Sequence, residues 1–185
     1  MRGLATCFVL LFAPAGSVHA QVLLTQEQAL DLAFPPPTEV ERRTAFLDEE
    51  QIEEVRRLSA PARSRYERSV VSYYVGVDGD GPLGAAYFDA HRVRTLQEVL
   101  MVVVSPEGLV SRIEVLGFAE PPEYMAPDGW MELFRGRGLE EANSTRGEIP
   151  LITGATLTSH AVSDAVRTSL ALHQVIRPFG SGDAP

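Results

Sequence analysis

The chain has 185 residues, 45% of them hydrophobic, and its mean hydropathy is close to zero. These values exclude a disordered chain and a polytopic membrane protein, and they predict one domain with appendages. All 16 basic residues are arginines, which excludes lysine chemistry, and the formal net charge is −9. Because nucleic-acid binding is driven by basic side chains, we expect no nucleic-acid partner.

Residues 1–20 are typical of a signal peptide. Arg2 precedes an apolar stretch, and small residues follow before a cleavage site ahead of Gln21. About a dozen apolar residues are fewer than the roughly 20 needed to span a bilayer. The alternatives are an uncleaved anchor or a buried helix. We expect export to the periplasm, or to the extracytoplasmic face of the membrane, with loss of the only cysteine, Cys7.

Residues 21–69 are predicted to be an N-terminal helical segment. One helix is expected over residues 25–33, ended by the prolines at 35–37. A second is expected over residues 47–58, where Asp48 is a plausible N-cap and apolar residues recur at helical spacing.

The character of the chain changes at residue 70. β-branched, aromatic and alternating patterns separated by turns predict strands over residues 70–77, 83–88, 99–104 and 109–117. A long amphipathic helix, capped by Thr158 or Ser159, is predicted to run to about Ile176. The remainder, residues 178–185, is expected to be a flexible tail. The predicted fold is α+β: short N-terminal helices precede a mostly antiparallel sheet, and the long C-terminal helix packs on it.

One segment carries a chemical signal. Thr153-Gly154-Ala155-Thr156 leads directly into the last predicted helix. Small residues allow a bulky group to approach the backbone, and the free N–H groups and positive dipole end of a helix N-terminus suit a phosphate. On physical grounds alone, an ordinary N-cap is the alternative.

Residues 153–159 resemble the flavinylation motif of the FMN-binding domain family. That family includes periplasmic FMN-carrying subunits of Rnf-type electron transport complexes and of sodium-translocating NADH:quinone reductase. The resemblance implies that Thr156 carries FMN through a phosphoester, which a flavin transferase makes from FAD. It implies that the neighbouring residues shape the site: Thr153, Gly154, Ala155, Leu157 and Thr158. It makes residues 70–177 the FMN-binding domain.

The resemblance extends upstream. Glu120 matches the acidic position of a family loop near the flavin, whereas Pro121 and Glu123 stand where that loop has threonine and glycine. Pro150 stands where the family usually has an aspartate. A cleavable signal, instead of the N-terminal membrane helix of the named subunits, implies a separate subgroup.

Other polar and aromatic residues are candidates for contact with the flavin. His91 begins a polar cluster that also holds Arg92, Arg94, Thr95 and Glu98. We interpret this cluster as a polar surface that contacts the flavin edge or the phosphate, and we expect His91 to donate a hydrogen bond to a flavin carbonyl. The alternative is a solvated loop.

Two aromatic residues, Tyr124 and Trp130, can stack on a flavin ring, although covering the core is the favoured interpretation. The histidines lack metal-site spacing, so no metal is expected. No glycine-rich dinucleotide motif is present, so the chain is not expected to bind NADH itself.

The sequence therefore predicts an exported flavoprotein electron carrier that passes electrons between redox partners at the cytoplasmic membrane. The expected partners are a flavin transferase for maturation and a membrane or periplasmic redox protein. The alternatives are a flavin-dependent reductase and a flavin-free binding or scaffold module of the same fold.

Overall fold

The computed structural model describes residues 21–60, 66–142 and 149–180. The predicted signal peptide, residues 1–20, lies outside the described residues, as do residues 181–185 of the predicted tail. In the described part of the chain, no helix is both long enough and apolar enough to cross a bilayer.

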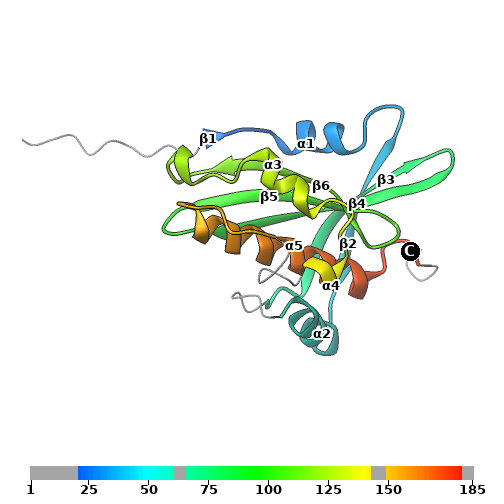
Figure 1. Cartoon of the computed structure of the whole chain (residues 1–185). Helices are drawn as coiled ribbons and strands as arrows, with labels where there is room; N and C mark the ends of the chain where they lie inside the picture. The colour runs from blue at the N-terminus through cyan, green and yellow to red at the C-terminus, as the bar shows by residue number, and fades with distance from the viewer. Residues whose placement is uncertain (1–20, 61–65, 143–148, 181–185) are drawn as a thin grey trace, which may run out of the picture.

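A six-stranded sheet forms the centre of the molecule (Figure 1). Its order is β1-β6-β5-β4-β3-β2, and all neighbouring pairs are antiparallel. The strands are β1 (Gln21–Val22), β2 (Glu39–Phe46), β3 (Val70–Asp78), β4 (Gly81–Arg92), β5 (Gln97–Val104) and β6 (Val110–Phe118). Together with a long C-terminal helix, this sheet confirms the predicted α+β fold.

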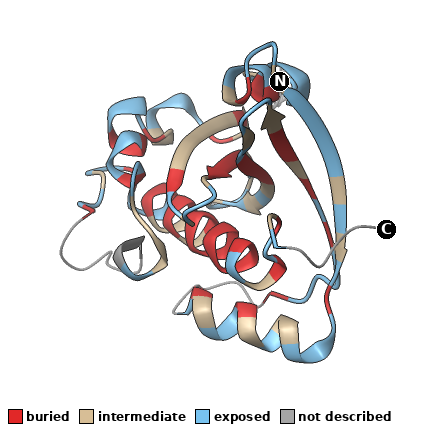
Figure 2. Cartoon of the chain, turned by 90° about the vertical axis from the view of Figure 1, so that its right-hand side faces the viewer, coloured by how far each residue is buried: buried red, intermediate tan, exposed pale blue. Residues whose placement is uncertain are grey.

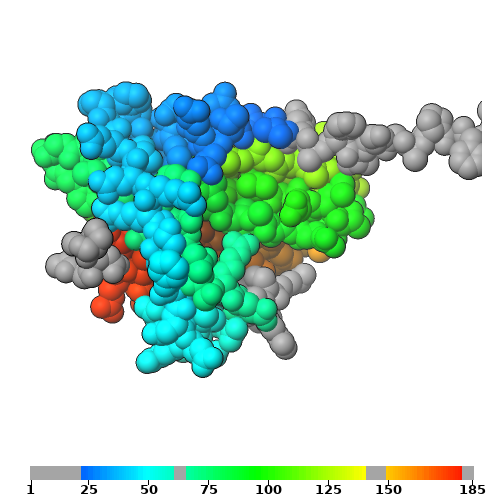
Figure 3. All heavy atoms as spheres, turned by 180° about the vertical axis from the view of Figure 1, so that it is seen from behind, coloured from blue at the N-terminus to red at the C-terminus, as the bar shows by residue number. Residues whose placement is uncertain are grey.

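Strand β2 was not predicted, and only helices were expected in residues 21–69. It pairs with β3 along its whole length, from Glu39 opposite Val77 to Phe46 opposite Val70. It is the edge strand, and five of its eight residues are charged or polar. Figure 3 shows β2 (cyan) beside α1 (blue) on the outer surface. Since neither side of β2 is fully covered, its sequence lacks the alternation by which half-buried strands are recognised.

Helix α1 (Gln26–Ala33) covers one face of the sheet. Thr25 caps it in a capping box with Gln28, which confirms the predicted start. Its apolar side packs on sheet residues that point away from α5: Ala86, Met101, Val103 and Leu116. At its end, the ring of Phe34 lies directly on Gly76, where any Cβ would overlap it.

Two helices cover the opposite face. Helix α5 (Thr156–Ile176) packs on β4 and β5, and α2 (Glu49–Ser59) packs beside α5 (Figure 1). Asp48 caps α2 as predicted. Figure 2 shows that α5 is buried around most of its circumference, whereas the outer side of α2 is exposed.

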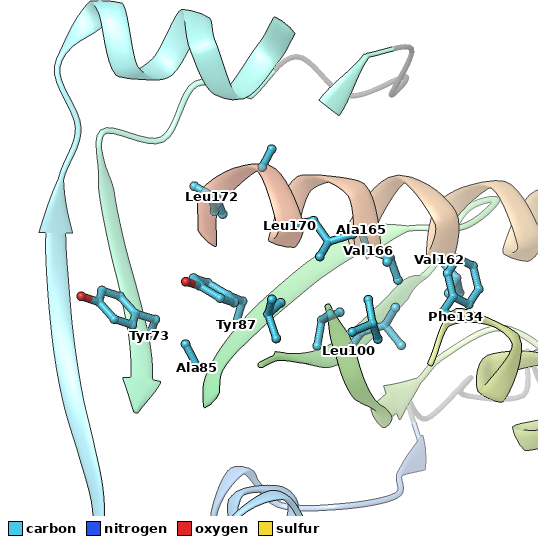
Figure 4. Packing of buried hydrophobic residues seen from close by; sticks show 14 of the residues in the cluster. Tyr73, Ala85, Tyr87, Leu100, Phe134, Val162, Ala165, Val166, Leu170 and Leu172 are labelled. Carbon is cyan, nitrogen blue, oxygen red and sulfur yellow. The ribbon is translucent and has the colours of Figure 1, made fainter. Parts of the chain in front are cut away.

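The main core lies between α5 and the sheet. Figure 4 shows α5 side chains meeting strand side chains there, with Phe134 at one end. The residues involved include Tyr73, Tyr87, Leu100, Val162, Val166 and Leu170. At the far end of α5, Phe179 packs against the ring of His173, with 5.5 Å between ring centroids. Pro178 accepts a hydrogen bond from Arg43 at 3.0 Å. The first residues of the predicted tail are therefore packed on the domain.

Short helical turns connect β6 to α5. They are η1 (Pro122–Tyr124), α3 (Asp128–Met131), η2 (Glu132–Phe134) and α4 (Leu139–Ala142). The short helix predicted near Trp130 is present as α3 and η2. These turns bring residues 119–134 to the end of the molecule where α5 begins (Figure 1).

Candidate functional site

The Thr-Gly-Ala-Thr tetrad forms a turn that leads into α5. Ala155 donates its N–H to the Ile152 carbonyl at 3.0 Å, and Gly154 has φ of +86°. A Cβ at Gly154 would meet nothing within 4 Å. Because the surroundings are open, the left-handed backbone conformation, and not lack of space, favours glycine here.

Thr156 is the first residue of α5, and its side chain is exposed. The first N–H groups of a helix have no carbonyl four residues earlier within the helix. The N-cap residue is Ala155, and no side chain caps this end. A solvent-accessible hydroxyl therefore stands beside uncapped N–H groups at a positive dipole end, which is the arrangement that a phosphate ester needs.

The other tetrad neighbours divide into exposed and buried residues. Thr153, Gly154 and Leu157 are exposed, and Leu157 has 43% of its surface accessible. Ala155 is buried at 3% exposure. Thr153 and Leu157 can therefore border a bound group, whereas Ala155 fills space beneath the turn.

Thr158 and Ser159 do not cap the helix, so that prediction is wrong. Thr158 is fully buried and donates its hydroxyl to the Tyr124 carbonyl at 2.5 Å. The Ser159 hydroxyl accepts from the Ile152 N–H at 3.0 Å and donates to the Ala155 carbonyl at 3.1 Å. Both hydroxyls hold neighbouring segments against the start of α5 and are not available to a cofactor.

Glu120 holds the connection between β4 and β5. Its Oε1 accepts the backbone N–H groups of Arg94, Thr95 and Leu96 at 3.2, 2.7 and 2.9 Å. The hydrogen bonds from Thr95 and Leu96 are the main reason that the pKa of Glu120 lies below its ordinary value. The side chain is 7% exposed. Through its Oε1, Glu120 therefore holds the β4–β5 connection in place at the site.

This loop is linked to the start of α5. The Arg94 guanidinium lies 4.8 Å from the centre of the Tyr124 ring, a cation–π contact. Since Tyr124 also accepts from Thr158, its position ties the β4–β5 connection to the first turn of α5.

His91 is clamped between two carboxylates. Its Nδ1 lies 2.7 Å from Asp89 Oδ1, and its Nε2 lies 2.9 Å from Glu98 Oε2. Burial alone lowers the pKa of His91, but the hydrogen bonds and charges of Asp89 and Glu98 outweigh it and raise the pKa to about 9. Because both ring nitrogens are engaged, His91 has no N–H to donate to a flavin carbonyl, which corrects the role predicted for it.

A hollow of about 150 Å³ lies between the end of β4 and the flank of α5. Its lining includes Asp89, His91 and Arg92 from β4, and Leu157, His160 and Asp164 from α5. Thr156 itself does not line it, but Leu157, the next residue along α5, does. A larger hollow, about 610 Å³, borders His173 and Arg177 at the opposite end of α5. At about 1.5 Å per residue, that end is far from the tetrad.

Trp130 contributes to the structure and not to a stacking surface. It is 7% exposed, packs edge-on against Phe134, and donates its indole N–H to the Pro150 carbonyl at 2.5 Å. The favoured interpretation, that it covers the core, is confirmed. Its hydrogen bond fastens the segment that precedes the tetrad.

Comparison with known families agrees with this site. Residues 97–171 match the family model described as the FMN-binding domain. This stretch, which is less than half of the 185 residues, is similar to that domain. The match contains Glu120 and all residues from Thr153 to Thr158, whereas His91 lies before it. No curated protein matches the chain.

The candidate site includes residues that the sequence analysis did not identify. Asp89 was not predicted, although it lies two residues before His91 and so on the same face of β4. His160, which lines the hollow, was not among the predicted flavin contacts. Their placement depends on how α5 lies across β4, which no local pattern reveals.

Proposed function

We propose that this chain is an exported electron carrier in which FMN is joined through its phosphate to the hydroxyl of Thr156. The observation that carries the proposal is the exposed Thr156 side chain at the uncapped start of α5. The match to the FMN-binding domain supports the identity of the cofactor. Bound FMN supplies one- and two-electron chemistry.

The chain's own groups hold the phosphate in this proposal. Backbone N–H groups in the first turn of α5 donate to phosphate oxygens, and the helix dipole favours their negative charge. Gly154 lets the chain turn tightly enough to present Thr156. A covalent bond keeps the cofactor with a protein that works outside the cytoplasm.

The size of the hollow supports a carrier. At about 150 Å³ it is smaller than the roughly 300–1,000 Å³ of ordinary small-molecule pockets. Such a hollow accepts one edge of the flavin ring system, and the remainder stays accessible to another protein. A redox protein at the cytoplasmic membrane therefore suits this site better than a small substrate enclosed beside the ring.

The test is the intact mass of the protein co-produced with a flavin transferase. Wild type is expected to gain the mass of FMN less one water, and Thr156→Ala is expected to show no gain. Thr44→Ala is the matched control, because Thr44 is also exposed but lies on the edge strand β2. It should gain the same mass as wild type.

Three outcomes would overturn parts of the proposal. A mass gain retained by Thr156→Ala would move the attachment site elsewhere. A yellow wild-type protein without a mass gain would mean non-covalent binding, and a colourless one would favour the scaffold alternative. The same mass spectrum tests removal of the signal peptide, because cleavage ahead of Gln21 determines the mass of the mature chain.

A further inference from the structure

The Asp89–His91–Glu98 cluster lies beneath the first half of α5. Asp89 and His91 point to the same face of β4, and Glu98 stands directly opposite His91 on β5. The Glu98 side chain is fully buried. Among the described residues, nothing binds its Oε1. A buried carboxylate is costly without a partner, so the contact with His91 favours a protonated, positively charged imidazole.

The cluster borders the proposed flavin position. Asp89 and His91 line the same hollow as Leu157, and Leu157 directly follows Thr156. The His91 side chain is 18% exposed. A charge in such a partly buried position is less screened by water and salt than one at the surface, so it acts more strongly on its neighbours.

We propose that His91 sets the redox potential of the flavin carried by Thr156, through the positive charge that Asp89 and Glu98 hold on its ring. The proposal rests on the proposed function. Electrons reach the flavin from the redox protein partner, and reduction adds negative charge at the hollow. A protonated His91 stabilises that charge and raises the midpoint potential relative to a neutral side chain. The proton stays on His91, and no bond to His91 is formed or broken; any proton that the reduced flavin takes up comes from solvent.

Other charged and titratable groups face the same hollow. They are Asp89 and Arg92 from the sheet, and His160 and Asp164 from α5. Glu98 does not line the hollow and contacts the ring of His91. Asp164 forms an ion pair with Arg167 at 2.7 Å. Arg92 is exposed, so it offers the same unit charge as His91 in a better-screened position.

The first experiment compares midpoint potentials of FMN-loaded wild type, His91→Gln and Arg92→Gln at pH 7. The His91→Gln protein is expected to have the lower potential, and Arg92→Gln is expected to shift much less. An unchanged potential in His91→Gln would overturn the proposal. An equal shift of the midpoint potential in Arg92→Gln would also overturn it, because the charge on His91 would then act no more strongly on the flavin than an exposed charge does.

A second experiment needs no variant, in case His91→Gln fails to fold. Coupling between two sites is reciprocal, so a proton that favours the reduced flavin must bind more tightly when the flavin is reduced. NMR titration of the FMN-loaded wild type should therefore give His91 a higher pKa in the reduced protein than in the oxidised protein. Equal values would overturn the proposal.

The two proposals fail in different ways. If the wild-type protein gains no FMN mass, the proposed function fails before any potential is measured. If FMN is attached at Thr156 but neither the potential nor the His91 pKa responds, only the role of His91 fails.

Discussion

Thr158 lies two residues after Thr156, and its hydroxyl donates to the Tyr124 carbonyl. The side chain of Thr156, in contrast, is exposed to solvent. The two threonines lie in the same helical turn and have opposite environments. The hydroxyl of Thr158 fastens η1 to α5, and the side chain of Thr156 is exposed. The stabilising hydroxyl and the proposed attachment point are therefore different threonines of one motif.

Replacing Thr158 by valine should destabilise the protein without its cofactor. The change leaves the Tyr124 carbonyl without this donor in a partly buried position, at a cost of about 0.5–1.5 kcal/mol. Guanidinium unfolding measures the difference. Thr156→Val is the control and should stay within about 0.5 kcal/mol of wild type, because its side chain is exposed. Equal stabilities of the two variants would contradict this division of roles.

Replacing Gly154 by alanine should destabilise the turn before α5. A residue with a Cβ at φ of +86° costs about 1–2 kcal/mol, even where space is open. Gly129→Ala is the matched control, because its Cβ would also meet open space and no positive φ occurs there. We expect Gly129→Ala to be neutral or slightly stabilising in thermal unfolding. A neutral Gly154→Ala would show that the turn tolerates a different conformation.

Replacing Glu120 by glutamine should remove charge-assisted hydrogen bonds from the β4–β5 connection. The pKa of Glu120 lies below its ordinary value, so its contribution to stability is present above the unfolded-state pKa and is lost as the pH falls. The variant should have a lower free energy of unfolding than wild type at pH 7. The difference between the two free energies should become smaller as the pH falls. Unfolding free energies across acidic pH test this. Glu123→Gln, an exposed change in the same loop, should leave the pH profile as in wild type.

His173 should make the domain sensitive to acid. Burial lowers its pKa to about 4, so the unfolded chain binds a proton more readily than the folded chain between about pH 6.5 and 4. Stability should therefore decrease as the pH falls through this range, by at most about 3 kcal/mol. His173→Gln should flatten this part of the profile, and His160→Gln should preserve it. A slope that survives in His173→Gln would assign the effect to another group.

Much of the fold could be predicted from the sequence because its signals are local. Asp48 caps α2, as its position before an apolar periodic segment indicates, and α1 begins directly after Thr25, where the predicted helix starts. The four predicted strands correspond to β3 to β6. Strand β2 gave no such signal, since an edge strand exposed along most of its length needs no hydrophobic alternation.

The start of α5 was misplaced for a different reason. A threonine or serine before an apolar helix usually caps it, and Thr158 and Ser159 met that pattern. Their hydroxyls bind the Tyr124 and Ala155 carbonyls instead, so the helix begins earlier, at Thr156. The acceptor at Tyr124 lies 34 residues away, beyond the reach of a local pattern.

The site was predicted in part. The tetrad was singled out because small residues and hydroxyls precede a helix there and because residues 153–159 resemble the flavinylation motif. The clamp on His91 was not, because it requires the register that places His91 opposite Glu98. A polar cluster was predicted there, but the engagement of both ring nitrogens depends on pairing between strands.

The pairing of β4 with β5 also limits how far the domain can be shortened. The family match begins at Gln97, the first residue of β5, yet β5 pairs with β4 from Gln97 opposite Arg92 to Val104 opposite Ala85. A chain cut at this boundary would present a long apolar strand with an open hydrogen-bonding edge, which invites association with other chains. The autonomous folding unit is therefore larger than the region of family similarity, and it includes the strand that carries Asp89 and His91.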